Sequence, residues 1–146
     1  YFSCTGRTQG VAETIAEETG GALHEIVPAV PYTEADLDYT VSDCRANEEQ
    51  RTPSARPEIA NSVENMADYD VVFLGYPIWQ GRAPKIIYTF LESYDFAGKT
   101  LIPFATSGGS GLAGAEKSLR QHCPAAAWKS GRLVRGDAPS WAKRAL

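Results

Sequence analysis

Residues 70–84 read DVVFLGYPIWQGRAP, and they set the pattern for the whole chain. The run 70–75 is continuously apolar after Asp70 and ends in glycine, as expected of a parallel strand buried on both faces. Pro84 predicts the start of a helix over 83–93, whose apolar residues repeat at helical spacing. The stretch therefore predicts a buried strand, a loop and a covering helix, which is half of a βαβ unit.

The same alternation extends in both directions. Helices are predicted at 8–19, stopped by Gly20-Gly21, and at 58–67, 113–122 and from Ser140 to the end. Strands are predicted at 22–27, at 99–104 and within 127–135, with Pro103 predicted to cause a bulge or an end near Phe104. The polar stretch 28–57 is interpreted as a long surface excursion with a short helix within 34–49. Strands alternating with helices predict one α/β domain over residues 1–146, built on a doubly wound parallel sheet.

Three unusual loops follow predicted strands and precede predicted helices. They are Ser3–Thr8, Tyr76–Ala83 and Thr106–Gly111. Ligands of doubly wound sheets bind beyond the carboxyl ends of the strands, so we expect the three loops to meet at one edge.

The first loop, SCTGRT (3–8), has the composition of an anion site. Gly6 permits the turn, the hydroxyls of Ser3, Thr5 and Thr8 add donors, and a helix N-terminus adds positive potential. A Walker A loop is excluded because no lysine lies nearby, and a cysteine phosphatase loop because Gly10 stands where its arginine would be. A plain serine/threonine helix cap stays an open alternative.

Together, SCTGRT (3–8), GYPIWQGRAP (75–84) and PFATSGGSG (103–111) resemble the flavodoxin family, in particular short bacterial flavodoxin-like proteins. The resemblance covers nearly the whole chain. It implies a three-layer, five-stranded parallel sheet with strand order 2-1-3-4-5 and bound FMN. The residues that it implies for FMN binding are Ser3, Cys4, Thr5, Gly6, Arg7, Thr8, Pro77, Ile78, Trp79, Gln80, Gly81, Thr106, Ser107, Gly108, Gly109 and Gly111.

By this resemblance each loop contacts a different part of FMN. The first loop would hold the phosphate through backbone amides, with Arg7 turned to solvent. In the second, Pro77, Ile78 and Trp79 would lie along the ribityl chain and the ring, with the Gln80–Gly81 backbone at flavin N5. The third loop would present amides to the pyrimidine edge, where reduced flavin gains negative charge. Taken singly, Trp79 could be an ordinary core aromatic and the glycine run a flexible surface loop.

Only Tyr1-Phe2 precede the first loop, whereas the first strand of such a sheet is central. We expect most of that strand to lie outside this sequence or to be supplied by another chain.

Composition narrows the other possibilities. No apolar run approaches the roughly 20 residues that span a bilayer, so no membrane segment is expected.

Three cysteines without a C-x-x-C pair favour the reducing cytoplasm over a disulfide framework or zinc site. The net charge of −4 and dispersed basic residues argue against nucleic acid. Seven basic residues after position 116 suggest a solvated end or a landing site for an acidic partner.

Three functions remain open, and the oligomeric state is not predicted. The third loop has no aromatic residue, so one flavin face would be open to nicotinamide or a quinone. This favours an FMN-dependent oxidoreductase that passes electrons from NAD(P)H or a reductase partner to a quinone or protein acceptor. The small size favours a non-enzymatic electron carrier, and a flavin-free binding module is the third possibility.

No catalytic side chain is expected, since the cofactor carries the chemistry. Cys4 is interpreted as a loop filler, with oxidation sensitivity as a secondary hypothesis because a helix N-terminus lowers thiol pKa values.

Overall fold

A computed structural model describes residues 1–107, 111–134 and 138–146 and shows an α/β fold around a parallel sheet. The helices are α1 (Arg7–Thr19), α2 (Glu34–Leu37), α3 (Arg45–Arg51), the 3-10 helix η1 (Met66–Asp68), α4 (Lys85–Glu92), α5 (Ala113–His122) and α6 (Ala138–Ala145). The strands are β1 (Val71–Pro77), β2 (Thr100–Thr106), β3 (Ala127–Trp128) and β4 (Arg132–Leu133).

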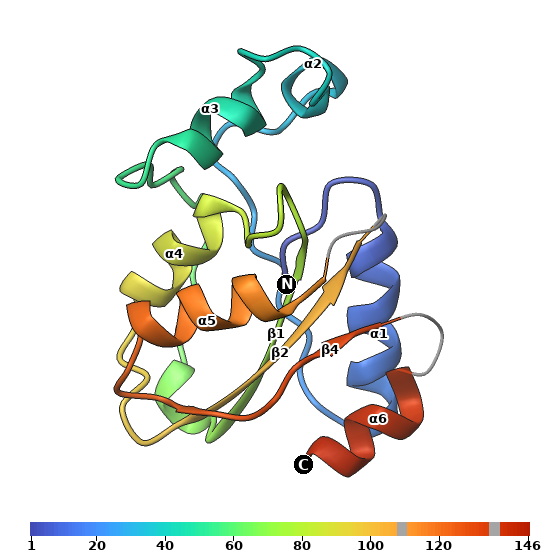
Figure 1. Cartoon of the computed structure of the whole chain (residues 1–146). Helices are drawn as coiled ribbons and strands as arrows, with labels where there is room; N and C mark the ends of the chain where they lie inside the picture. The colour runs from blue at the N-terminus through green and yellow to red at the C-terminus, as the bar shows by residue number, and fades with distance from the viewer. Residues whose placement is uncertain (108–110, 135–137) are drawn as a thin grey trace.

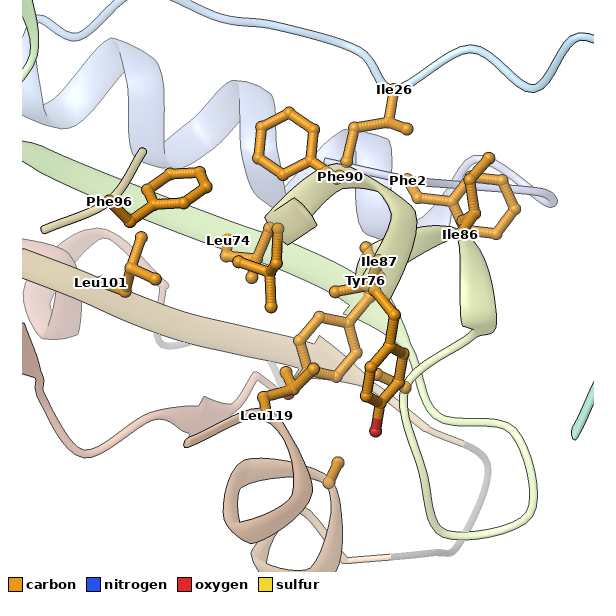
Figure 2. Close-up of a cluster of buried hydrophobic side chains, with 14 of the residues drawn as sticks. Phe2, Ile26, Leu74, Tyr76, Ile86, Ile87, Phe90, Phe96, Leu101 and Leu119 are labelled. Atoms are coloured by element: carbon orange, nitrogen blue, oxygen red, sulfur yellow. The ribbon is translucent and has the colours of Figure 1, made fainter. Parts of the chain in front are cut away.

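Helices cover both faces of the sheet (Figure 1). Helices α4 and α5 pack on one face, where apolar side chains from β1, α4 and α5 gather into a single cluster (Figure 2). Helices α1 and α6 cover the other face, with Ile15 and Trp141 packed against Ile102 and Phe104 of β2. Each face of the parallel strands is thereby removed from water, which explains their continuous apolar sequences.

The sheet order found is β1-β2-β3, with β4 also pairing to β2. Four strands are present in the described residues, so the expected five-strand order is not reproduced in full. Residues 22–27 form no assigned strand, in contrast to the prediction. They run beside Tyr1, whose amine donates to His24 O (2.8 Å) and whose carbonyl accepts from Ile26 N (2.7 Å). Phe2 N in turn donates to Gly75 O of β1 (2.9 Å).

Pro103 does not end β2, contrary to the expectation of a bulge or an end near Phe104. The carbonyls of Leu101 and Ala105 accept bonds from Lys129 and Val134, so Pro103, midway between them, turns its nitrogen to the same side. There the neighbouring strand is broken into β3 and β4, and a Cβ on Gly131 would lie 2.6 Å from Pro103 O. The missing N–H of Pro103 thus faces the break.

The other helical predictions had mixed outcomes. Helices α1, α4 and α5 agree with the predicted ranges, and Gly20 ends α1 in the left-handed conformation (φ 73°). The helix predicted at 58–67 is wrong, because this region holds only η1 and an antiparallel bridge between Pro28 and Ile59. The excursion 28–57 carries two short helices, α2 and α3, and lies beyond the carboxyl end of the sheet (Figure 1).

An apolar groove of about 480 Å³ lies at the opposite end of β1 from the three loops. Its walls include Ile15 of α1, Leu23 and the first half of β1, Val71–Leu74. No described residue of the three loops lines it, so it is separate from the described part of the candidate site. No helix in the described part of the chain is both long enough and apolar enough to cross a membrane.

Candidate functional site

The second and third loops start side by side at the carboxyl edge of the sheet. Strands β1 and β2 are parallel, and their last residues, Pro77 and Thr106, are partners in the register. Just beyond them, Ile78 N donates to Thr106 O at 2.9 Å. The two loops therefore leave the sheet from one place.

The first loop is bonded to the same place. Thr8 Oγ1 and Thr106 Oγ1 lie 2.8 Å apart and share a hydrogen bond. Both side chains are buried, with 2% and 6% exposure. The Thr8 hydroxyl thus joins the first loop to the third, and because either hydroxyl can be the donor, its donation to an anion stays a prediction. All three loops meet at one edge.

Backbone amides without a protein acceptor line the first loop. Gly6 is the N-cap of α1 and has a left-handed conformation (φ 87°). Because glycine has no side chain, the cap residue offers no side-chain acceptor to the amides of the first helical turn. Ser3 Oγ accepts from Gln9 N at 3.2 Å. The alternative of a plain serine/threonine helix cap therefore explains the amide of Gln9 alone. Among the described residues, none accepts from the amides of 5–8, and Thr5, Gly6 and Arg7 are exposed. Such a cluster of amides at a helix N-terminus suits an anion such as phosphate.

Cys4 is not an activated thiol. Burial raises its pKa to about 12, and the nearby Arg45 guanidinium opposes this only in part. The hypothesis of an oxidation-sensitive Cys4 is therefore not supported, because a thiol with a raised pKa forms little thiolate at neutral pH. The filler interpretation fits its position, half-buried against the apolar cluster.

The side chain of Trp79 packs against two other aromatic rings. Its ring lies edge-on to Phe2 (5.8 Å between centroids) and to Tyr32 (5.5 Å). Tyr32 is held by a 2.5 Å bond to Glu49, and the Arg45 guanidinium lies 3.7 Å from the centre of its ring. The packing fixes the orientation of Trp79 while leaving its side chain partly exposed.

Residues 79–82 form a tight two-residue turn. Trp79 N donates to Arg82 O (2.8 Å), and Arg82 N donates to Trp79 O (3.1 Å). Gln80 and Gly81, the central residues, both have positive φ, 54° and 75°. This is the pattern of a type I′ turn.

The excursion 28–57 contacts this turn, which no pattern in the sequence indicates. Gln80 Nε2 donates to Asn47 Oδ1 (2.5 Å), and Gln50 Nε2 donates to Trp79 O (2.9 Å). Asn47 and Gln50 lie on α3, some 30 residues earlier. A polar amide inside a short helix is an ordinary surface pattern, so no local signal could have identified either residue.

In the third loop the structure describes Thr106 and Ser107 at the end of β2, and Gly111 before α5. The predicted residues Gly108 and Gly109 lie outside the described residues. Gly81 approaches this region closely, because a Cβ on Gly114 of α5 would be 3.3 Å from Gly81 O.

Comparisons with known proteins give one consistent result. The family model described as flavodoxin matches residues 1–144. Two solved structures of provisionally named flavoproteins, from Bacteroides uniformis and Bacteroides eggerthii, are each 44% identical with a TM-score of 0.95. These alignments cover 98% and 99% of this chain and 94% of the other chain in each case.

A more distant structure has the same fold. It is a flavoprotein from Lactobacillus acidophilus in complex with FMN, 23% identical with a TM-score of 0.77, and the alignment covers 97% of this chain and 94% of that one. No curated protein matches the chain.

Proposed function

Since the chain belongs to the flavodoxin family, we propose that it binds FMN where the three loops meet and acts in electron transfer. The observation that carries the proposal is the row of free amides at 5–8, joined through the Thr8–Thr106 bond to the two neighbouring loops. The Lactobacillus acidophilus relative, which was crystallised with FMN, supports the choice of cofactor.

The phosphate group would be bound mainly by the main chain. The free amides of Thr5, Gly6, Arg7 and Thr8 lie at the start of the 13-residue helix α1, whose dipole favours negative charge. Ser3 and Thr5 can add hydroxyl donors. A Cβ on Gly6 would meet nothing within 4 Å, so the loop has open space beside this residue.

The flavin ring would rest against the second and third loops. The remaining proposed contacts are Cys4, Pro77, Ile78, Trp79, Gln80, Gly81, Thr106, Ser107, Gly108, Gly109 and Gly111. FMN, when bound, supplies the ability to accept and donate electrons. The chain's own part is to orient the ring, with Trp79 fixed on Phe2 and Tyr32, and to offer amide donors to its polar edge.

We further propose an oxidoreductase that takes electrons from NAD(P)H or a reductase partner and delivers them to a quinone or protein acceptor. Of the two aromatic residues in the three loops, Tyr76 is fully buried and Trp79 is partly exposed. A single aromatic contact to the ring supports one flavin face being open to a substrate. A non-enzymatic electron carrier is the alternative, supported by the small size of the chain.

One series of measurements separates the three functions. Protein mixed with FMN and passed through a desalting column retains the visible flavin spectrum if the cofactor binds, and colourless protein supports the binding module. Steady oxidation of NADPH in the presence of a quinone supports the oxidoreductase. Flavin that is reduced only by an added reductase protein supports the carrier.

We also infer the strand order of the family, with residues 24–26 beside Tyr1-Phe2 and Phe2 beside β1. The bonds of Tyr1 to His24 and Ile26, and of Phe2 to Gly75, support this order. Slow hydrogen exchange of the Ile26 amide would agree with it, and exchange at the rate of an unstructured peptide would contradict it.

The three free cysteines support a reducing compartment such as the cytoplasm.

A further inference from the structure

We propose that Asn47 and Gln50 of α3 are positioning residues that hold the 79–82 turn in its left-handed conformation. The link to flavin binding rests on the proposed function, because this turn belongs to the second proposed FMN loop. The hold of α3 on the turn does not depend on any cofactor.

The conformation of the turn needs support. Gln80 is the only residue other than glycine with positive φ among 1–107, 111–134 and 138–146. Left-handed backbone is unfavourable for residues with a Cβ, and type I′ turns prefer asparagine, aspartate or glycine at this position. A glutamine there is a poor local choice, so contacts from elsewhere must stabilise the turn.

Helix α3 provides these contacts on both sides of the strained residue. Asn47 Oδ1 accepts from Gln80 Nε2 at 2.5 Å. Gln50 Nε2 donates to Trp79 O at 2.9 Å and to Ala83 O at 3.3 Å, which ties the two flanks of the turn to one amide group.

The amide of Asn47 is itself oriented by hydrogen bonds to the excursion. Asn47 is 6% exposed, and its Nδ2 donates to Tyr39 O and Val41 O, each at 3.1 Å. Its oxygen is thereby left to face Gln80. The oxygen of Gln50 is buried and has no partner among the described residues, so the bonds of this side chain come from its donor end.

Helix α5 contacts the opposite side of the 79–82 turn. Arg82 NH1 donates to Ser118 Oγ at 2.7 Å, and the carbonyl of Gly81 approaches Gly114, where a side chain would be 3.3 Å away. The turn therefore lies between α3 and α5. Removing the α3 contacts would leave it attached on one side and free to leave the costly conformation.

The first test needs no FMN. We compare backbone amide hydrogen exchange in the full chain, wild type and Gln50→Ala, following Arg82, whose amide bonds Trp79 O. Exchange at Arg82 should become about tenfold faster, as expected when a residue in the left-handed region loses its support. The amide of Ile102, a fully buried residue of β2 in the strand's pairing with β1, reports global unfolding and should not change.

Glu48→Ala is the matched control, because Glu48 lies exposed on the same helix and, within the described part of the chain, its carboxylate pairs with Arg51 alone. It should change Arg82 exchange less than twofold. Equal exchange rates in Gln50→Ala and Glu48→Ala would overturn the proposal. A rescue adds a second criterion: Gln80→Gly in the Gln50→Ala background should restore slow exchange at Arg82, since glycine accepts positive φ. Failure of the rescue would also overturn it.

Flavin binding gives the functional test. If the competent turn is only partly populated, the apparent dissociation constant for FMN rises in proportion. Gln50→Ala should weaken FMN binding about fivefold, and Glu48→Ala should not. Wild-type protein that fails to bind FMN would sink the proposed function and leave the exchange result standing. Equal FMN binding in all variants, together with unchanged exchange at Arg82, would contradict only the proposed positioning role of Gln50.

Discussion

The hydroxyls of Thr8 and Thr106, 98 residues apart in the chain, share a hydrogen bond of 2.8 Å. The bond joins the first turn of α1 to the last residue of β2, and both groups are buried. It fixes the distance between the proposed phosphate loop and the loop proposed for the pyrimidine edge.

Breaking one side of this bond should cost more than removing both. Thr8→Val leaves the Thr106 hydroxyl buried without a partner, which costs about 1–3 kcal/mol in the free energy of unfolding, and Thr106→Val should act likewise. The double variant should lose less than either single variant, because no unpaired hydroxyl is then left buried. Urea unfolding of the four proteins measures this coupling, and strictly additive losses would show that the bond contributes nothing to stability.

Gly75 is required by the packing of Phe104 across the strands. A Cβ on Gly75 would lie 2.1 Å from Phe104 Cζ and 2.4 Å from Cε2. Gly75→Ala should therefore lower the free energy of unfolding by about 3 kcal/mol through overpacking.

The matched control is Gly10→Ala on α1, where a Cβ would meet nothing within 4 Å. This change should raise stability by about 0.5–1 kcal/mol, since alanine is the better helix former. Both free energies come from urea unfolding. If the two alanines have the same effect, the ring of Phe104 is not packed against Gly75 as described.

Cys4 should resist thiol reagents in the folded protein. With its pKa raised to about 12, almost none of this thiol is ionised at about pH 8, whereas the unfolded chain has the ordinary value near 9. The shift also stabilises the folded state below about pH 9, and this contribution is lost as the pH rises to about 12.

A disulfide reagent followed by mass spectrometry measures the modification of Cys4 in buffer and in urea. We expect slow modification in buffer and rapid modification in urea. Equal rates in both would mean that Cys4 is not buried in the native loop.

Local sequence signals predicted the elements whose causes are local. Gly20 ends α1, Pro84 precedes α4, and the apolar run before Gly75 forms β1, all as expected. Each of these depends on backbone freedom or on burial of a continuous segment, which can be read within a few residues.

Predictions failed where a distant partner decides the outcome. Pro103 stays inside β2 because the neighbouring strand breaks at Gly131, a residue 28 positions away that no local pattern connects to it. The helix predicted at 58–67 does not form, because Ile59 instead bridges to Pro28. The contacts of α3 with the Gln80 turn are likewise set by the path of the excursion.

Gly6 should matter for ligand binding more than for packing. A Cβ there has open space, but the residue has a φ of 87°, so Gly6→Ala strains the loop by about 1 kcal/mol or more. We expect FMN affinity to fall about tenfold or more, measured by quenching of flavin fluorescence. Affinity that does not change would show that the loop conformation seen at Gly6 is not the one that binds.

The central claim is that backbone amides of residues 5–8 hold the phosphate of FMN. Titrating the wild-type protein with FMN and with riboflavin, which has the same ring and ribityl chain without the phosphate, tests it most directly. The account predicts that FMN binds at least about a hundredfold more tightly, as expected for a dianion held by several amides and a helix N-terminus. Equal affinities for the two flavins would contradict it.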